Sequence, residues 1–336
     1  MNEAVRASFL ASYLAPLHPL LTDPSVVEVA INPDGQVWVE CQGAAHMDLV
    51  SRIHVGPRLA EDLANAIASD VNVPLSAKRP VVSGKIEVAG HPVRVQVAAA
   101  PAVEAAPSIT FRRYSQDKLP VERISLLHGT LVDLDQRRRA RAQEVRDLAG
   151  AGRITDAMRL CIEDRLNIVI SGGTSTGKTT FARALLDLVH PAERLITIED
   201  AFELFPAQAN TVALKSDRTP GSEKSPAKLL EACLRMRPDR IILGELRGTE
   251  ATTFLEALNT GHGGSLTTIH ADTALKAIDR IAMMVLGSGL NMTFDDVRTY
   301  CAQAVDVVVQ LGRVEGKRGV QELWVQDGED RCLKNG

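Results

Sequence analysis

The stretch Gly172-Gly173-Thr174-Ser175-Thr176-Gly177-Lys178-Thr179, with Thr180 beside it, carries the strongest chemical signal in the chain. It fits G-x-x-x-x-G-K-[ST] and lies between an apolar strand-like segment and a segment of helical periodicity. Such glycines let successive backbone N–H groups surround phosphate oxygens at the positive end of a helix. Lys178 would reach the β- and γ-phosphates, and the Thr179 hydroxyl would hold Mg²⁺. The stretch therefore predicts a site for a nucleoside triphosphate.

Two apolar segments each end in carboxylates. Glu199 and Asp200 follow Leu195–Ile198, and Glu245 follows Arg240–Leu243 after one residue. Because the carboxyl ends of the strands in such a sheet face the phosphates, we expect these acids to point at the metal ion and the attacking water. One carboxylate would orient the water, and another would steady Mg²⁺ through its hydration shell.

Two histidines flank a third strand candidate, Ser265–Ile269. His270 follows the strand, so we expect it on the same rim as the carboxylates, where it would bind the γ-phosphate or relay its loss to the next helix. His262 precedes the strand in a glycine-rich turn, and for this residue a purely structural role remains the alternative.

Composition excludes several classes of protein. The chain of 336 residues has 38 Lys+Arg against 42 Asp+Glu, and this balance argues against a dedicated nucleic-acid binder. With 7 Phe, 3 Tyr and 2 Trp, stacking of single-stranded bases is not expected either. The five cysteines show no C-x-x-C spacing, so we expect buried thiols rather than zinc ligands or disulfides. The longest uncharged run contains Pro16 and Pro19 and is too short to span a bilayer, which predicts a soluble, cytoplasmic protein.

Patterning divides the chain into three zones. Residues 1–130 predict a small α+β domain, with strand pairs that turn at Asn32–Gly35 and Ala89-Gly90 and a helix at Pro57–Ser69. Residues 154–336 alternate apolar strands with helices, which predicts a mostly parallel sheet covered on both faces.

Between these zones, residues 131–153 form a charged segment that includes Arg137, Arg138, Arg139 and Arg141. We interpret it as a solvated helical linker, with a strip for DNA or anionic lipid as the alternative. The beginning of the chain, with Phe9, Leu10, Tyr13, Leu14 and Leu17, is typical of an amphipathic helix. Packing against its own domain is favoured there over docking on a partner or a membrane.

Four motifs together resemble the secretion (traffic) ATPases of type II and type IV secretion. They are similar, in order, to that family's Walker A, Asp box, Walker B and His box: GGTSTGKT, ITIEDAFEL, LRMRPDRIILGELRG and GHGGSLTTIHAD. The amino-terminal zone fits through PSVVEVAINPDGQVWVE, RPVVSGKIEVAGHPVRVQV and SITFRR. The resemblance is closest to the ring ATPases of the conjugation-like type IV branch, and the cysteine tetrad of the type II assembly ATPases is missing.

This resemblance implies a RecA-like P-loop domain behind a smaller α+β domain, in a hexameric ring that holds ATP between the two domains. Such a motor hydrolyses ATP with Mg²⁺ and moves its domains to power substrate translocation or pilus assembly. Its expected partners are inner-membrane secretion proteins at the cytoplasmic face, with peripheral membrane association and without stable nucleic-acid contact. The alternatives are a pilus assembly or retraction motor of the same superfamily and a low-turnover nucleotide-dependent switch.

The resemblance also implies roles for single residues. Lys178, Glu199, Glu245 and His270 match catalytic positions, and Thr179, Glu199 and Glu245 would serve Mg²⁺. Arg94 and Arg112 match arginines that contact the nucleotide, and Arg113 is a weaker candidate.

The chain departs from the family pattern at two positions. Gly244 stands where a Walker B aspartate is usual, so metal contact would come mainly from Thr179, water and neighbouring acids. Glu231 stands where pilus motors place an arginine, so Arg235 or Arg237 is left to bridge subunits. The long linker further implies a nucleotide domain that is swapped against a neighbouring subunit's first domain.

Overall fold

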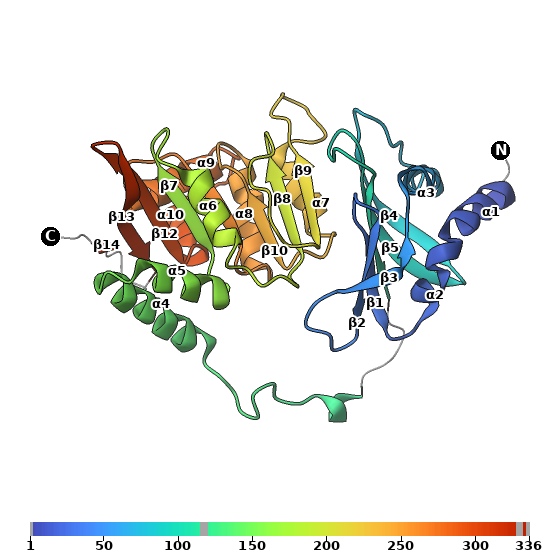
Figure 1. Ribbon diagram of the computed structural model, residues 1–336, viewed down its shortest axis with the longest axis horizontal. Coiled ribbons are helices and arrows are strands. Elements are labelled where there is room, and N and C mark those ends of the chain that lie inside the picture. Colours follow the sequence, from blue (N-terminus) through green and yellow to red (C-terminus); the bar gives the residue numbers. More distant parts are fainter. Residues whose placement is uncertain (1–2, 115–119, 327–331, 334–336) are drawn as a thin grey trace. The chain divides into compact units, whose positions relative to one another are not determined.

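The computed structural model describes residues 3–114, 120–326 and 332–333, and these fall into two compact units (Figure 1). The first unit combines Met1–Tyr114 with His190–Gly244, and the second combines Ser115–Val189 with Glu245–Gly336. The division of the sequence at residues 130 and 153 stays a prediction.

The first unit contains a six-stranded antiparallel sheet in the order β3-β2-β1-β6-β5-β4. Its strands are β1 Val26–Ile31, β2 Gln36–Cys41, β3 Asp48–His54, β4 Val81–Val88, β5 His91–Ala98 and β6 Ser108–Arg113. Both expected hairpins are confirmed, since β1 pairs with β2 and β4 pairs with β5. Strand β3 was not predicted, because it is an edge strand whose side chains are mostly exposed and do not alternate regularly.

Helices α1 Glu3–Leu14, α2 His18–Thr22 and α3 Pro57–Asp70 pack on one face of this sheet. Leu10, Leu14 and Leu17 enter a shared hydrophobic core with Phe111 of β6. The preference for packing of the first helix against its own domain is therefore confirmed.

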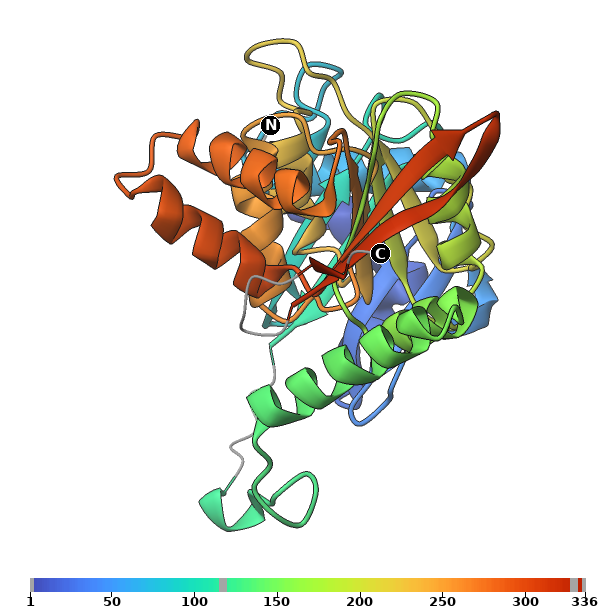
Figure 2. The same cartoon turned by 90° about the vertical axis from the view of Figure 1, so that its left-hand side faces the viewer.

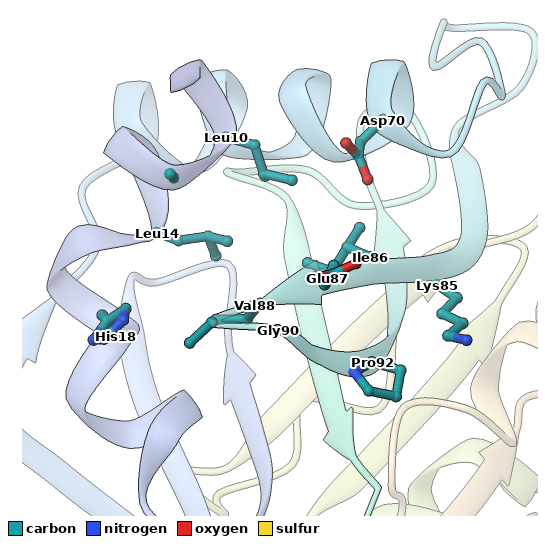
Figure 3. A pocket seen from close by; sticks show the side chains of 12 residues that line it. Leu10, Leu14, His18, Asp70, Lys85, Ile86, Glu87, Val88, Gly90 and Pro92 are labelled. Atoms are coloured by element: carbon teal, nitrogen blue, oxygen red, sulfur yellow. The ribbon is translucent and has the colours of Figure 1, made fainter. Parts of the chain in front are cut away.

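A cavity of about 750 Å³ lies between α1, α2 and the hairpin of β4 and β5 (Figure 3). Leu10, Leu14 and Val88 give it an apolar wall, whereas His18 and Asp70 add polar groups. None of the residues that were predicted to bind nucleotide lines this cavity.

The second sheet has eight strands in the order β14-β13-β12-β7-β11-β10-β8-β9. These are β7 Ile168–Gly172, β8 Leu195–Glu199, β9 Thr211–Lys215, β10 Arg240–Leu243, β11 Leu266–Ile269, β12 Val307–Val314, β13 Lys317–Val325 and β14 Cys332–Leu333. In the first unit β10, β8 and β9 run parallel, and in the second unit β11, β7 and β12 do so. The mostly parallel sheet is confirmed, and β13 and β14 add an antiparallel edge.

Helices cover both faces of the strands in the second unit. Figure 2 shows the green helices α4–α6 and the orange helices α9 and α10 on opposite sides of the red strands β12 and β13. The helices associated with this sheet are α4 Leu134–Gly150, α5 Ile154–Glu163, α6 Lys178–Leu186, α7 Pro226–Cys233, α8 Glu250–Asn259, α9 Ala274–Leu286 and α10 Phe294–Ala304. No helix within the described ranges has the length and the apolar character needed to cross a membrane.

The charged segment forms helix α4, so the helical part of its prediction is confirmed, but this helix is bound to its own unit rather than solvated on all sides. Asp133 caps its start by accepting a hydrogen bond from the backbone N–H of Gln136. Arg138 Nε lies 2.5 Å from Asp306 Oδ1, and Arg141 Nε lies 2.6 Å from Asp164 Oδ2. Two arginines of the cluster therefore hold α4 against the rest of the unit.

The buried and exposed phenylalanines of the first unit give a test of this core. Phe111 is 0% exposed, whereas Phe9 on α1 is 51% exposed. Phe111→Ala should lower the free energy of unfolding by about 3–5 kcal/mol, because removal of the ring leaves a cavity in the core. Phe9→Ala should cost less than about 1 kcal/mol. Urea denaturation followed by circular dichroism measures both, and equal losses would contradict this packing.

Candidate nucleotide-binding site

The glycine-rich stretch links a buried strand to a helix, as its sequence predicts. Strand β7 ends at Gly172, and helix α6 begins at Lys178. Ser175 and Gly177 have φ values of +60° and +93°, in the left-handed region that glycine adopts without strain. This backbone curls the loop in front of the positive end of α6, an arrangement that suits an anion.

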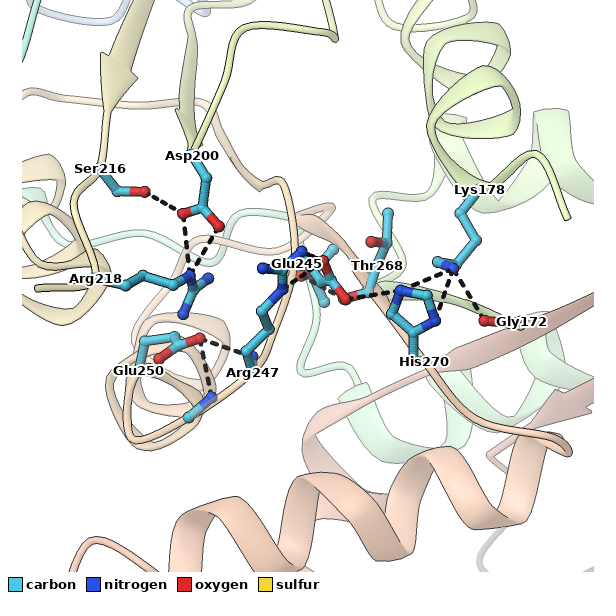
Figure 4. A network of polar contacts seen from close by, with 12 residues as sticks. Gly172, Lys178, Asp200, Ser216, Arg218, Glu245, Arg247, Glu250, Thr268 and His270 are labelled. Carbon is cyan, nitrogen blue, oxygen red and sulfur yellow. Dashed lines mark hydrogen bonds and ion pairs between the residues drawn. The ribbon is translucent and has the colours of Figure 1, made fainter. Parts of the chain in front are cut away.

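Lys178 turns back onto its own loop (Figure 4). Its Nζ donates to the carbonyl oxygens of Gly172 and Gly173, at 2.9 and 3.0 Å. Both ring nitrogens of His270 lie 3.4 Å from the same Nζ. Burial lowers the pKa of Lys178, and Glu245 acts in the opposite direction. The ammonium group is therefore held at the phosphate loop by neutral acceptors, which a phosphate oxygen can replace.

Glu245 continues this chain of contacts. Its Oε1 lies 3.1 Å from Nε2 of His270, and its Oε2 lies 2.7 Å from Nε of Arg247. The side chains of Lys178, His270, Glu245 and Arg247 thus form a continuous polar chain within the second unit (Figure 4). The sequence had placed the first three of them at one rim, and the structure brings them together.

His270 is the central member of this chain. Its pKa is lowered from 6.5, first by burial and then by the charge of Lys178. Glu245 favours the protonated ring, but burial and the neighbouring cations outweigh it. The ring is therefore neutral near pH 7, and the tautomer with a proton on Nε2 satisfies the contacts: Nε2–H donates to Glu245, and Nδ1 accepts from Lys178.

Glu199, at the end of β8 in the first unit, has both oxygens engaged. Oε1 accepts from the Thr197 hydroxyl at 2.9 Å, and Oε2 accepts from the backbone N–H groups of Glu203 and Leu204 at 2.8 and 3.0 Å. The residue is 5% exposed. In this conformation the carboxylate fixes the turn after β8, and its role in water activation stays a prediction.

The neighbouring Asp200 has different partners (Figure 4). Arg218 Nε lies 2.8 Å from its Oδ2, and the Ser216 hydroxyl donates to its Oδ1 at 2.7 Å. Asp200 thus fastens the segment after β9 to the end of β8.

The backbone around Gly244 leaves little room for a side chain. A Cβ atom at this position would lie 3.3 Å from the carbonyl oxygen of Ile198 and 3.4 Å from Cγ of Glu199. Both distances are close, so glycine lets the end of β10 approach the end of β8. The backbone N–H of Gly244 donates to the same Ile198 carbonyl at 2.8 Å.

Arg94 and Arg112 are directly opposite each other on β5 and β6, so they share one face of the first sheet. Both are exposed. Arg94 contacts Tyr114 through its Nε and lies 4.9 Å from the centre of that ring. Arg113 donates to the backbone carbonyls of Asp23 and Val26, a structural contact, and as the next residue on the strand it faces the other side.

The two subunit-bridging candidates differ in their surroundings. Arg237 binds Glu40 through Nε at 2.8 Å and Nη2 at 3.1 Å, and its Nη1 lies 2.6 Å from Asp239. Arg235 is exposed and donates to the Glu231 carbonyl at 3.3 Å. Arg237 is therefore committed to its own chain in this conformation.

His262 lies apart from His270, because the two histidines flank opposite ends of β11. Burial lowers its pKa, and its backbone carbonyl accepts from the Ser265 hydroxyl. Sequence reasoning missed Arg247, which binds Glu245, and Arg280, whose Nη1 donates to the His270 carbonyl at 2.7 Å. The motif GELRG contained Arg247, whereas no spacing rule pointed to Arg280 on α9.

Among the residues that the structure describes, no three His, Cys, Asp or Glu side chains form a group able to hold a metal ion. A P-loop does not need such a group, because Mg²⁺ keeps several waters and is bound by substrate phosphates and one or two protein groups. Thr179, half-buried in the first turn of α6, has the donor type and the position for this.

Comparison with known proteins identifies the family. The family model described as "Type II/IV secretion system protein" matches residues 16–334. The chain belongs to this family. It is 32% identical over 306 residues to the conjugal transfer protein TrbB of Rhizobium radiobacter, covering 90% of this chain and 84% of that protein. It is also 32% identical over 348 residues to the type IV secretion system protein VirB11 of Brucella suis biovar 1, covering 98% and 93%.

A solved structure agrees with this assignment. The crystal structure of the VirB11 ATPase from the Brucella suis type IV secretion system, in complex with sulphate, matches with a TM-score of 0.84 at 32% identity. The match covers 97% of this chain and 96% of that chain. The fold is thus a RecA-like P-loop domain preceded by a smaller α+β domain, as the sequence predicted.

The neutral state of His270 gives a pH-dependent prediction. Lys178→Met should raise the midpoint of the His270 titration, because it removes a neighbouring positive charge, and Glu245→Gln should lower it. NMR of the imidazole Cε1–H signal measures the midpoint, with assignment from a His270→Gln variant. Lys228→Met, at an exposed lysine that pairs with Glu223, serves as control. Identical midpoints in all variants would refute the contact chain.

Proposed function

We propose that this protein is the ATP-hydrolysing motor of a type IV secretion or conjugative transfer system. The observation that carries the proposal is the chain of contacts from Lys178 through His270 to Glu245 at a phosphate loop. The family and the relatives named TrbB and VirB11 support the type IV branch over a pilus motor.

In the proposed cycle, the triphosphate displaces the loop carbonyls from Lys178. The ammonium then pairs with the β- and γ-phosphates, and the Thr179 hydroxyl would hold the Mg²⁺ that accompanies ATP, which would neutralise phosphate charge. Once the ammonium group of Lys178 has left His270, protonation of the ring is favoured, so Nδ1 would take up a proton and donate to a γ-phosphate oxygen while Nε2–H still donates to Glu245. His270 and Arg280 thereby couple the phosphate to helix α9.

Glu199 is proposed to orient the attacking water. Because both of its oxygens are engaged at the turn after β8, this role requires that the turn rearranges when nucleotide binds. Arg94 and Arg112 are proposed to contribute phosphate contacts, which is consistent with their exposure on one sheet face. Release of these contacts after hydrolysis would drive the domain motion.

The proposed assembly is a homohexamer at the cytoplasmic face of the inner membrane, in contact with inner-membrane secretion proteins. The proposal divides each subunit into an α+β domain of residues 1–130, a linker of residues 131–153 and the ATPase domain of residues 154–336. Its support is the near full-length similarity to VirB11 proteins.

Removal of the phosphate-binding lysine tests hydrolysis. Lys178→Ala should reduce ATP turnover at least about 100-fold, because the charge that stabilises the transferring phosphate is lost. Glu199→Gln should also reduce turnover strongly while leaving nucleotide binding in place. Phosphate release at equal folded concentration measures both, with Lys228→Ala as the exposed control. Turnover near wild type in Lys178→Ala and Glu199→Gln would refute the catalytic assignment.

The oligomeric state tests the assembly. With a non-hydrolysable ATP analogue and Mg²⁺, negative-stain images should show rings of six-fold symmetry, because each subunit would need a neighbour to complete its contacts. A persistent monomer at micromolar concentration would contradict the proposed motor.

A further inference from the structure

Five charged side chains lie opposite one another across the six-stranded sheet. The register pairs Glu40 with Glu28, Glu28 with Arg112, Arg112 with Arg94, and Arg94 with Lys85. Because directly opposite residues share a face, the five form one row from β2 to β4, which we call the charged row. Its acidic end adjoins its basic end at the pair of Glu28 and Arg112.

This pair joins a buried acid to an exposed base. Glu28 is 6% exposed, and its Oε1 lies 3.4 Å from Nε of Arg112. The side chain of Arg112 is 63% exposed. The positive charge that Arg112 presents to an anion from solvent is therefore partly balanced by the buried carboxylate of Glu28.

The charges around Glu28 come from several elements. Arg112 on β6 lies beside it, Glu40 on β2 is opposite it, and Arg194 and Arg237 approach from the segments that flank β8 and β10. Arg237 is bound to Glu40. Burial raises the pKa of Glu28 to about 7, with Arg112 as the main opposing influence. The carboxyl group therefore changes charge near neutral pH.

We propose that Glu28 is a positioning residue that acts through Arg112. The negative charge of Glu28 weakens the interaction of Arg112 with a nucleotide phosphate. Binding of nucleotide is therefore accompanied by uptake of a proton at Glu28. This inference rests on the proposed function, in which Arg112 contacts phosphate. A phosphate group near Arg112 disfavours a second negative charge on Glu28. By linkage, ionisation of Glu28 must then weaken binding by the same factor.

The sign of the pH dependence follows from this. Bound nucleotide raises the pKa of Glu28 further, so affinity is highest below about pH 7 and falls as pH rises through that value. Neutral Glu28 leaves Arg112 with its full positive potential, whereas ionised Glu28 promotes release.

Isothermal titration calorimetry of the full-length protein with Mg·ADP, between pH 6 and pH 8.5, tests the inference. Glu28→Gln should bind about 3- to 10-fold more tightly than wild type at pH 8, and about equally at pH 6. Because both proteins bind the same ligand, any pH dependence that comes from protonation of ADP itself is the same in both and cancels in the ratio of their affinities. In wild type, repetition in buffers of different ionisation enthalpy should show proton uptake near pH 7 that the variant lacks. This second measurement holds even if the variant folds poorly.

Two further variants separate the outcomes. Glu87→Gln removes an exposed acid from the same sheet face, opposite Pro92, and should leave the affinity and its pH profile unchanged. With Arg112→Gln as background, Glu28→Gln should lose its effect, because the two residues act as a pair.

The failures can be told apart. If Lys178→Ala abolishes binding but Glu28→Gln binds as wild type does at pH 8, the role of Glu28 is overturned and the proposed function stands. If wild type does not bind Mg·ADP, the proposed function fails, and this inference fails with it.

Discussion

The ammonium group of Lys178 is the point on which the candidate site depends. It is half-buried, and carbonyl oxygens of its own loop accept its hydrogen bonds. Buried charge without partners is costly, so the loop must present acceptors that a ligand can later replace. The left-handed backbone at Ser175 and Gly177, the position of His270 and the orientation of Glu245 all serve this requirement.

Charge also organises the first unit, where it ties the six-stranded sheet to the strands β8–β10. Arg194 is fully buried, and its Nη1 donates to Asn32 at 2.7 Å and to Asn210. Its Nε donates to the Met236 carbonyl at 2.9 Å. These bonds offset only part of the desolvation of the guanidinium, because Nη2 is buried without a hydrogen-bond partner among the described residues and burial lowers the pKa of Arg194 to about 10. The charged row continues from this cluster to Arg112, so the nucleotide-binding candidates and the buried cluster share one sheet face.

Much of the fold was predictable because local signals and tertiary structure agree. The hairpins around Asn32–Gly35 and Ala89-Gly90, and the helix that begins at Pro57, have the predicted ends or lie within a few residues of them. Strands β3, β9 and β13 escaped prediction. Exposure removes the apolar pattern from most of β3 and from the first half of β13, whereas β9 is an edge strand of five residues with only two fully buried apolar side chains. The packing of α4 was also unpredictable, since it depends on acids that are far away in the sequence.

The sequence by itself determined the phosphate loop, the alternation of apolar strands with helices around it, and the three residues that meet there, because each follows from local spacing. Only the tertiary structure decided which groups the acids and the arginines of the site bind. The carboxylate of Glu199 accepts hydrogen bonds from the turn after β8, and the guanidinium of Arg237 is paired with Glu40. Such pairings arise between segments that are distant in the chain, so no local pattern encodes them. The link between Glu28 and Arg112 is of the same kind, because strand register alone places a buried acid behind an exposed arginine.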